Sequence, residues 1–287
     1  PQAGGGKTIM TVEPKFIPDE SVRIDIRDNL SLNVRLVDCT GYPVPGAQGY
    51  MDGDDPRMVR TLWFDEPVPF VEAAEVGTEK VIMDHATIGI VVTTDGSIVD
   101  IPREAYVEAE RQVVAKMAAL GKPFVIVLNS RDPYSKEASD LATDMEGEYG
   151  VPVIPADCLS LNHDDIVLIM EQLLYEFPVK EITVRLPKWV QTLGVSHWLR
   201  NDLDQSIKDA VHSVKRVRDI DGCVMRLGAA DHVAKVNVGK VDMATGTAVM
   251  DLETTEEAFF EVLGEKTGIV LQDKSDILNL MGELVSA

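Results

Sequence analysis

The spacing of hydrophobic residues predicts alternating strands and helices in the first part of the chain. Three short runs are almost entirely apolar or β-branched, as buried parallel strands are. They span residues 86–94, 124–129 and 151–155. Around them, apolar residues recur at helical spacing over 71–83, 104–120, 135–149 and 164–175. Because strands and helices alternate, we expect crossover connections and an α/β fold built as a three-layer sandwich.

The segment before these elements shows the two-residue alternation of half-exposed strands. Residues 21–26 and 30–38 alternate in this way, and Asp28 and Asn29 between them favour a turn. We expect an antiparallel hairpin at the edge of the main sheet. Residues 42–70 are rich in Pro, Gly and Asp, and so long a loop inside a compact domain is typical of a functional segment.

The pattern changes near residue 180. A short strand is expected at 181–186 and an amphipathic helix at 202–218, which would carry Lys215, Arg216 and Arg218 as a basic stripe. A solvated helix face is favoured for that stripe over a contact with an acidic neighbouring subunit. The last elements predicted are a β-rich stretch at 231–250 and helices at 254–263 and 274–284. We therefore expect two domains, residues 1–180 and residues 181–287, the second of the α+β class.

Composition narrows the classes of function. The formal charge of -21 argues against nucleic acid as a partner, since a polyanion would be repelled. No apolar run approaches the roughly 20 residues of a membrane-spanning helix. Cys39, Cys158 and Cys223 lie far apart in the sequence, without the spacing of a metal site, so we expect reduced, buried thiols and a cytoplasmic protein.

A candidate site follows the strand expected at 30–38. That strand ends at Asp38, and Gly41 stands three residues later, which is the D-x-x-G layout of P-loop nucleotidases. There the aspartate supports Mg²⁺, usually through water, and the glycine amide faces the γ-phosphate of the nucleotide. The alternative is an ordinary strand that ends in a turn.

The phosphate-binding loop of such a site is not found in this sequence. Gly6, Lys7 and Thr8 give the end of G-x-x-x-x-G-K-[S/T], but Pro1 stands where the first glycine is needed. We expect the first strand, the P-loop and the first helix to precede Pro1. Without them the chain is expected to bind nucleotide poorly and to be inactive alone.

A base-recognition motif is expected after the strand at 124–129. Asn129 and Asp132 stand in the register of N-K-x-D in GTPases, where the aspartate accepts two protons from guanine, but Ser130 replaces the lysine. An intact Asp132 indicates guanine, so the preference between ATP and GTP stays open from these residues. Asn129 is also compatible with a simple turn. Tyr42 follows Gly41 where many GTPases carry a water-positioning glutamine, so another group must place the water.

Four strings of the sequence carry a resemblance to a known family, at residues 7–16, 34–47, 197–200 and 214–219. They are similar to the stage IV sporulation protein A family of spore-coat morphogenetic ATPases. The resemblance implies a fold from the translation-factor class of GTPases, with ATP and Mg²⁺ as cofactors. It also implies self-assembly into the basement layer of the spore coat. Its implied partners are further copies of itself, a small amphipathic membrane-anchoring peptide, other coat proteins and, through regions outside this chain, the mother-cell side of the forespore outer membrane.

The same resemblance adds Thr11 to the candidate site, at the position of the family's sensor threonine. Such a hydroxyl contacts Mg²⁺ and senses the γ-phosphate. Thr8 is an alternative hydroxyl, and a loop threonine with no metal is a third interpretation. The set predicted is therefore Thr11 and Asp38 for catalysis and metal, with Gly41, Asn129 and Asp132 for the nucleotide. The other functions considered are a regulatory GTPase and a structural scaffold with a vestigial nucleotide fold.

Overall fold

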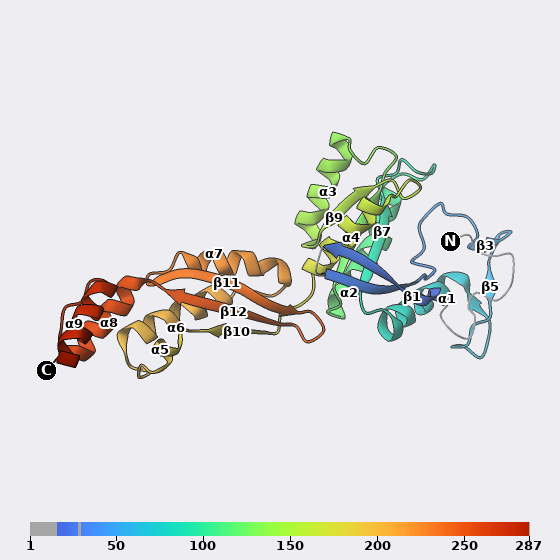
Figure 1. Cartoon of the computed structure of the whole chain (residues 1–287). Helices are drawn as coiled ribbons and strands as arrows, with labels where there is room; N and C mark the ends of the chain where they lie inside the picture. The colour runs from blue at the N-terminus through green and yellow to red at the C-terminus, as the bar shows by residue number, and fades with distance from the viewer. Residues whose placement is uncertain (1–15, 28–29, 287) are drawn as a thin grey trace. The chain divides into compact units, whose positions relative to one another are not determined.

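The computed structural model describes residues 16–27 and 30–286, which fall into two compact units that divide between Glu176 and Phe177 (Figure 1). The prediction from sequence put this division near residue 180. The first unit is of the mixed α/β class with a parallel sheet. None of the helices in the described ranges is long and apolar enough to cross a membrane.

The first unit contains nine strands and four α-helices among the described residues. Its strands are β1 (Phe16–Arg27), β2 (Leu30–Val37), β3 (Met51–Asp52), β4 (Asp55–Pro56), β5 (Met58–Val59), β6 (Val68–Pro69), β7 (Gly89–Thr94), β8 (Phe124–Asn129) and β9 (Val153–Ala156). Its helices are α1 (Phe70–Lys80), α2 (Glu104–Ala119), α3 (Lys136–Tyr149) and α4 (His163–Tyr175), with a π-helical turn at Val81–His85. The strands and helices predicted between residues 71 and 175 are confirmed, with small shifts at their ends.

The central sheet of this unit has the order β7-β8-β9 and is parallel throughout. Helices α2 and α3 pack on one face, where Met117 and Met145 meet Ile126 and Leu128 of β8. The alternate residues Val125 and Val127 are also buried, and α4 packs against β8. Burial on both faces explains why β8 is an uninterrupted apolar run.

The predicted hairpin is confirmed, but its place in the sheet is not. Strands β1 and β2 pair antiparallel, from Phe16 opposite Val37 to Arg27 opposite Leu30, and form a sheet of their own. The expected position at the edge of the main sheet is therefore wrong for the described residues. Within the same residues β7 pairs only with β8, so its other edge carries no strand.

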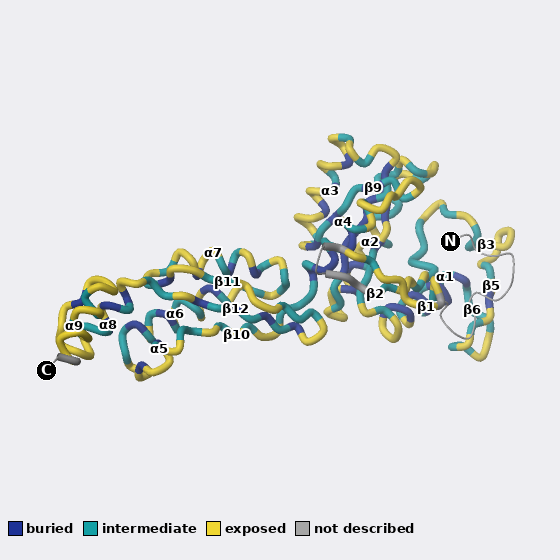
Figure 2. The backbone as a smooth tube through the Cα atoms, in the orientation of Figure 1, coloured by how far each residue is buried: buried dark blue, intermediate teal, exposed yellow. Residues whose placement is uncertain are grey.

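The second unit pairs a three-stranded sheet with five α-helices in the part of the chain that the structure describes. The sheet order is β10-β12-β11, with β10 parallel and β11 antiparallel to β12. The elements are β10 (Glu181–Arg185), α5 (Lys188–Gln191), α6 (Trp198–Val211), α7 (Ile220–Gly228), β11 (Val233–Asp242), β12 (Thr247–Thr254), α8 (Glu256–Thr267) and α9 (Lys274–Ser286). Two apolar clusters form its core, whereas α9 is largely exposed (Figure 2).

The helix predicted at 202–218 is wrong at its second end. Helix α6 stops at Val211, and a turn and a short 3-10 segment at Val217–Asp219 lead into α7, which the sequence pattern did not predict. The amides of Lys215 and Arg216 donate to Asp219 Oδ2, each over 2.9 Å, and Val217 N donates to the Phe177 carbonyl. These bonds hold the chain out of helical geometry. The expected basic stripe is therefore not a helix face.

Candidate functional site

Polar residues gather where the parallel strands β7, β8 and β9 end. The amide of Asp95, just after β7, donates to the Asn129 carbonyl over 3.3 Å, and the Ser130 amide donates to the Ala156 carbonyl over 3.0 Å. The carboxyl ends of the three strands are thus joined directly. This edge of a parallel sheet is where open α/β folds bind ligands.

Ser130 is a buried residue at this edge, and its hydroxyl forms hydrogen bonds there. Its residue exposure is 1%, and its hydroxyl accepts from the Asp132 amide over 3.1 Å. Burial by itself raises the pKa of Asp95, but hydrogen bonds from Ser130, Ser97 and Thr94 outweigh it and leave the pKa of Asp95 below its usual value. Ser130 therefore stabilises an ionised Asp95 and cannot cover a base, as the lysine of a GTPase motif would.

Asn129 and Asp132, the predicted base-binding pair, have different surroundings. Asn129 Oδ1 accepts from the Cys158 amide over 3.0 Å and so fixes the loop after β9. Asp132 is exposed, and its backbone is fixed on both sides, by Ser130 and by Ser135. Its carboxylate makes none of the hydrogen bonds or ion pairs found among the described residues. It is thus free to accept from a ligand.

Asp38 and Gly41, the predicted metal and phosphate residues, follow β2. Asp38 is exposed to solvent. Gly41 has a φ of +79°, and its amide donates to Thr78 Oγ1 of α1 over 3.0 Å. That amide can reach a phosphate only if the bond to Thr78 opens. Cys39 between them is partly buried, and this burial raises the pKa of its thiol.

The two halves of the predicted site are not hydrogen-bonded to each other in the described part of the chain. Residues 38–41 follow β2 of the β1–β2 sheet, whereas residues 129–132 begin with the last residue of β8 in the β7–β9 sheet. The loop after Gly41 does approach the loop after β7, because a Cβ atom built on Gly46 would lie 4.0 Å from Ile101 Cγ1. Thr11, with Thr8, lies outside the described residues. Across 16–27 and 30–286, no group of three His, Cys, Asp or Glu side chains is placed to hold a metal ion.

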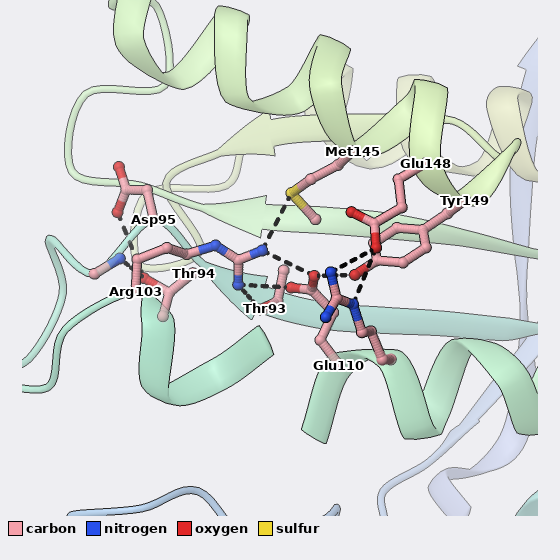
Figure 3. A network of polar contacts seen from close by, with 10 residues as sticks. Thr93, Thr94, Asp95, Arg103, Glu110, Met145, Glu148 and Tyr149 are labelled. Carbon is pink, nitrogen blue, oxygen red and sulfur yellow. Dashed lines mark hydrogen bonds and ion pairs between the residues drawn. The ribbon is translucent and has the colours of Figure 1, made fainter. Parts of the chain in front are cut away.

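A buried ion pair lies beside this edge, and sequence reasoning missed it. Figure 3 shows Arg103, Glu110 and Tyr149 pointing toward one another. Arg103 binds both Glu110 oxygens, over 2.7 and 2.8 Å, and the Tyr149 hydroxyl donates to Glu110 Oε1 over 2.7 Å. Arg103 also donates to Thr93 Oγ1 over 3.3 Å and lies close to Met145 Sδ. The network joins β7, α2 and α3.

Charges and hydrogen bonds in this network set its protonation. Burial alone raises the pKa of Glu110, but hydrogen bonds from Arg103 and Tyr149 and the arginine charge hold it below the usual value. Burial and the hydrogen bond to Glu110 raise the pKa of Tyr149. At neutral pH the arrangement is therefore a carboxylate, a guanidinium and a neutral phenol. The sequence signal for it was weak, because Arg103, Glu110 and Tyr149 look like ordinary helix residues.

Comparisons with known proteins place these features in one family. Residues 1–178 match the family described as "Stage IV sporulation protein A, ATPase domain", and residues 179–287 match "Stage IV sporulation protein A, middle domain". The chain belongs to the stage IV sporulation protein A family. The resemblance inferred from the sequence strings is therefore confirmed.

Curated members of the family align with the chain from end to end. Stage IV sporulation protein A of Bacillus subtilis (strain 168) and that of Bacillus anthracis are each 42% identical over 287 residues, which is 100% of this chain. The protein of Clostridioides difficile (strain 630) is 43% identical over 284 residues, or 99% of the chain. The chain spans 58% of the length of each of these relatives. No solved structure matches it significantly.

Proposed function

We propose that this chain is the core of a protein that hydrolyses Mg-ATP and uses the cycle to assemble with copies of itself into the basement layer of the spore coat. The observation that carries the proposal is Asp38, an exposed carboxylate at the end of β2, followed by Gly41 in a family with an ATPase domain. The fold would then be that of a P-loop NTPase of the translation-factor class.

The residues at this place fit a magnesium nucleotide. Asp38 is exposed and follows a strand, as a carboxylate that supports Mg²⁺ through water does. Apart from its two chain neighbours, no described residue has a heavy atom within 4 Å of the position that a Cβ would take on Gly41, so this side of the glycine is open, while its amide is bonded to Thr78. Asp38 would hold the hydrated metal, and Thr11 would add a hydroxyl. The bound Mg²⁺ would neutralise charge on the phosphates.

The remaining parts of the site would come from the rest of the protein. Because relatives are longer than this chain, we propose that a further strand with a P-loop pairs with the open edge of β7. Its backbone amides and lysine would hold the β and γ phosphates. By the same family argument, the assembled protein would lie on the mother-cell side of the forespore outer membrane. There it would meet a small amphipathic anchoring peptide and other coat proteins.

Substitution of Asp38 in the full-length protein tests the proposal. Because a carboxylate that acts on the metal through water belongs to the outer shell, Asp38→Asn is expected to lower ATP hydrolysis by roughly 10- to 100-fold. Phosphate release at saturating Mg²⁺ is the measurement, and sedimentation of assembled protein is the second readout. Asp144→Asn is a matched control, since Asp144 is also exposed but lies on α3.

Unchanged hydrolysis and unchanged assembly in Asp38→Asn would overturn the proposal. That result would favour a structural scaffold whose nucleotide fold is vestigial. Loss in both variants would instead indicate a general effect of removing surface charge, and the role of Asp38 would be rejected.

A second candidate function, a regulatory GTPase, has one observation in its favour. The Asp132 carboxylate is exposed and makes no contact found among the described residues, so it can accept the paired donors of guanine. Competition of GTP against ATP for the full-length protein decides between them. Stronger binding of GTP, lost in Asp132→Ala, would favour the GTPase, whereas preference for ATP would exclude it.

A further inference from the structure

Two loops at the proposed nucleotide edge are each tied to the end of the neighbouring strand. The bond from Cys158 N to Asn129 Oδ1 ties the loop after β9 to the last residue of β8, and the bond from Ser130 N to Ala156 O ties the loop after β8 to the last residue of β9, both over 3.0 Å. Strands β8 and β9 are neighbours and parallel, so both loops leave the same edge of the sheet. Side chains carried by these loops therefore start from one edge of the sheet.

Each loop carries one large apolar side chain that is almost fully exposed. Tyr134 is 90% exposed and Leu159 is 92% exposed, and no other large hydrophobic residue described exceeds them. Single exposed apolar residues are ordinary on protein surfaces. Two of them on loops that leave neighbouring strands at a ligand-binding edge are more informative, because together they offer an aromatic face and an aliphatic contact.

The residues around Tyr134 explain why this position is needed. Ser130 is buried and its hydroxyl is occupied by Asp132 N, so nothing in the motif itself covers a base. Tyr134 lies two residues beyond Asp132, whose carbonyl accepts from Ser135 Oγ over 2.8 Å and from Ser135 N over 3.1 Å. These bonds fix the backbone on both sides of Tyr134 while its ring stays in solvent.

We propose that Tyr134 and Leu159 form the platform on which the purine base of the nucleotide stacks, with Asp132 accepting from the base's exocyclic amino group. This inference rests on the proposed function. Aromatic rings stack on bases without regard to sequence, and a flat ring with a free face is what such stacking requires. Tyr134 would thus do the work that a lysine does over the base in GTPases.

The test separates base binding from triphosphate binding in the full-length protein. Calorimetry would measure the Kd of a non-hydrolysable ATP analogue with Mg²⁺, and the Kd of inorganic tripolyphosphate with Mg²⁺ as a probe that has no base. Tyr134→Ala is expected to raise the Kd of the analogue roughly tenfold and to leave that of tripolyphosphate unchanged. Tyr134→Phe should bind the analogue like the native protein. Leu159→Ala should raise the Kd of the analogue by less than Tyr134→Ala does. Met225→Ala, an exposed apolar change in the second unit, is the control.

The outcomes are distinct. Native affinity for the analogue in Tyr134→Ala, or an equal loss for both probes, would overturn the platform while leaving the proposed function intact. If the native full-length protein binds neither the analogue nor tripolyphosphate, the proposed function fails and the platform fails with it.

Discussion

The two units of the chain place their ionic contacts differently. In the first unit the Glu110 side chain is 1% exposed and binds a guanidinium and a phenol between two helices and a strand. In the second unit Glu265 is 44% exposed, and it accepts from Trp198 Nε1 over 2.7 Å and contacts His197 Nε2 over 3.1 Å. The core there is apolar instead. The difference teaches that a carboxylate kept from water links the elements of the first unit, whereas the carboxylate that joins Trp198 and His197 in the second unit stays in contact with water.

The largest effect is expected from removing the buried carboxylate. Glu110→Ala leaves Arg103 with an uncompensated charge and should destabilise the first unit by about 3 kcal/mol, the lower end for such losses because Arg103 keeps some exposure. Hydrogen exchange at the amides of α2 and α3 is the measurement, since a two-unit chain need not unfold in one step. Exchange protection like that of the native chain would contradict the prediction.

A matched control lies on the same two helices. Arg111 and Glu148 also bridge α2 and α3, over 3.0 Å, but both are about half exposed. Glu148→Ala should therefore lower the stability of the first unit by less than about 1 kcal/mol. Equal effects of the two substitutions would remove burial as the cause of the difference.

Acid and alkali should act on the same network. The folded pKa of Glu110 lies below its ordinary value of 4.5. The contribution of its carboxylate to the stability of the fold is therefore complete above pH 4.5 and is lost as the pH falls through the folded pKa. The folded pKa of Tyr149 lies above its ordinary value of 10.0. The contribution of its neutral phenol to the stability of the fold is therefore complete below pH 10.0 and is lost as the pH rises through the folded pKa. The protection of α2 and α3 amides from hydrogen exchange, corrected for intrinsic rates, should fall at both low and high pH. Glu110→Gln should remove the acid dependence, and an unchanged acid limb would contradict the assignment.

The smallest effect is expected in the second unit. Glu265→Ala removes an exposed acceptor from Trp198 and His197 and should cost about 1 kcal/mol or less. Urea unfolding followed by tryptophan fluorescence reports on it, because two of the three tryptophans, Trp189 and Trp198, lie in this unit, and Trp63→Phe removes the signal of the first unit. A loss as large as that of Glu110→Ala would mean that the two units do not differ in the way proposed.

The sequence pattern predicted where strands and helices lie better than it predicted which other residues or strands they contact. Strand β8 and the helix that Ser135 caps were predicted closely, because their signals are local. The helix expected at 202–218 fails because its last turn is held instead by Asp219 and by the distant Phe177 carbonyl. Hydrophobic spacing carries no information on such partners. The separation of the β1–β2 hairpin from the main sheet was missed for the same reason.

The candidate site was predictable in part. Asp38, Asn129 and Asp132 were found because motif spacing is visible in the sequence, and their roles stay predictions. Asp95 was not among the residues predicted, since its partner Ser130 lies 35 positions away and its hydrogen bonds appear only in the fold. Tyr134 has no signal of its own, because exposure of a ring is a property of the folded surface.

The open edge of β7 has a practical consequence. Its backbone donors and acceptors face no strand in the described residues, and Val92 at its middle is 60% exposed. Bare β edges of this kind recruit strands from other molecules. Preparations of the 287-residue chain should therefore aggregate as concentration rises, and versions that carry the further strand proposed above should stay dispersed.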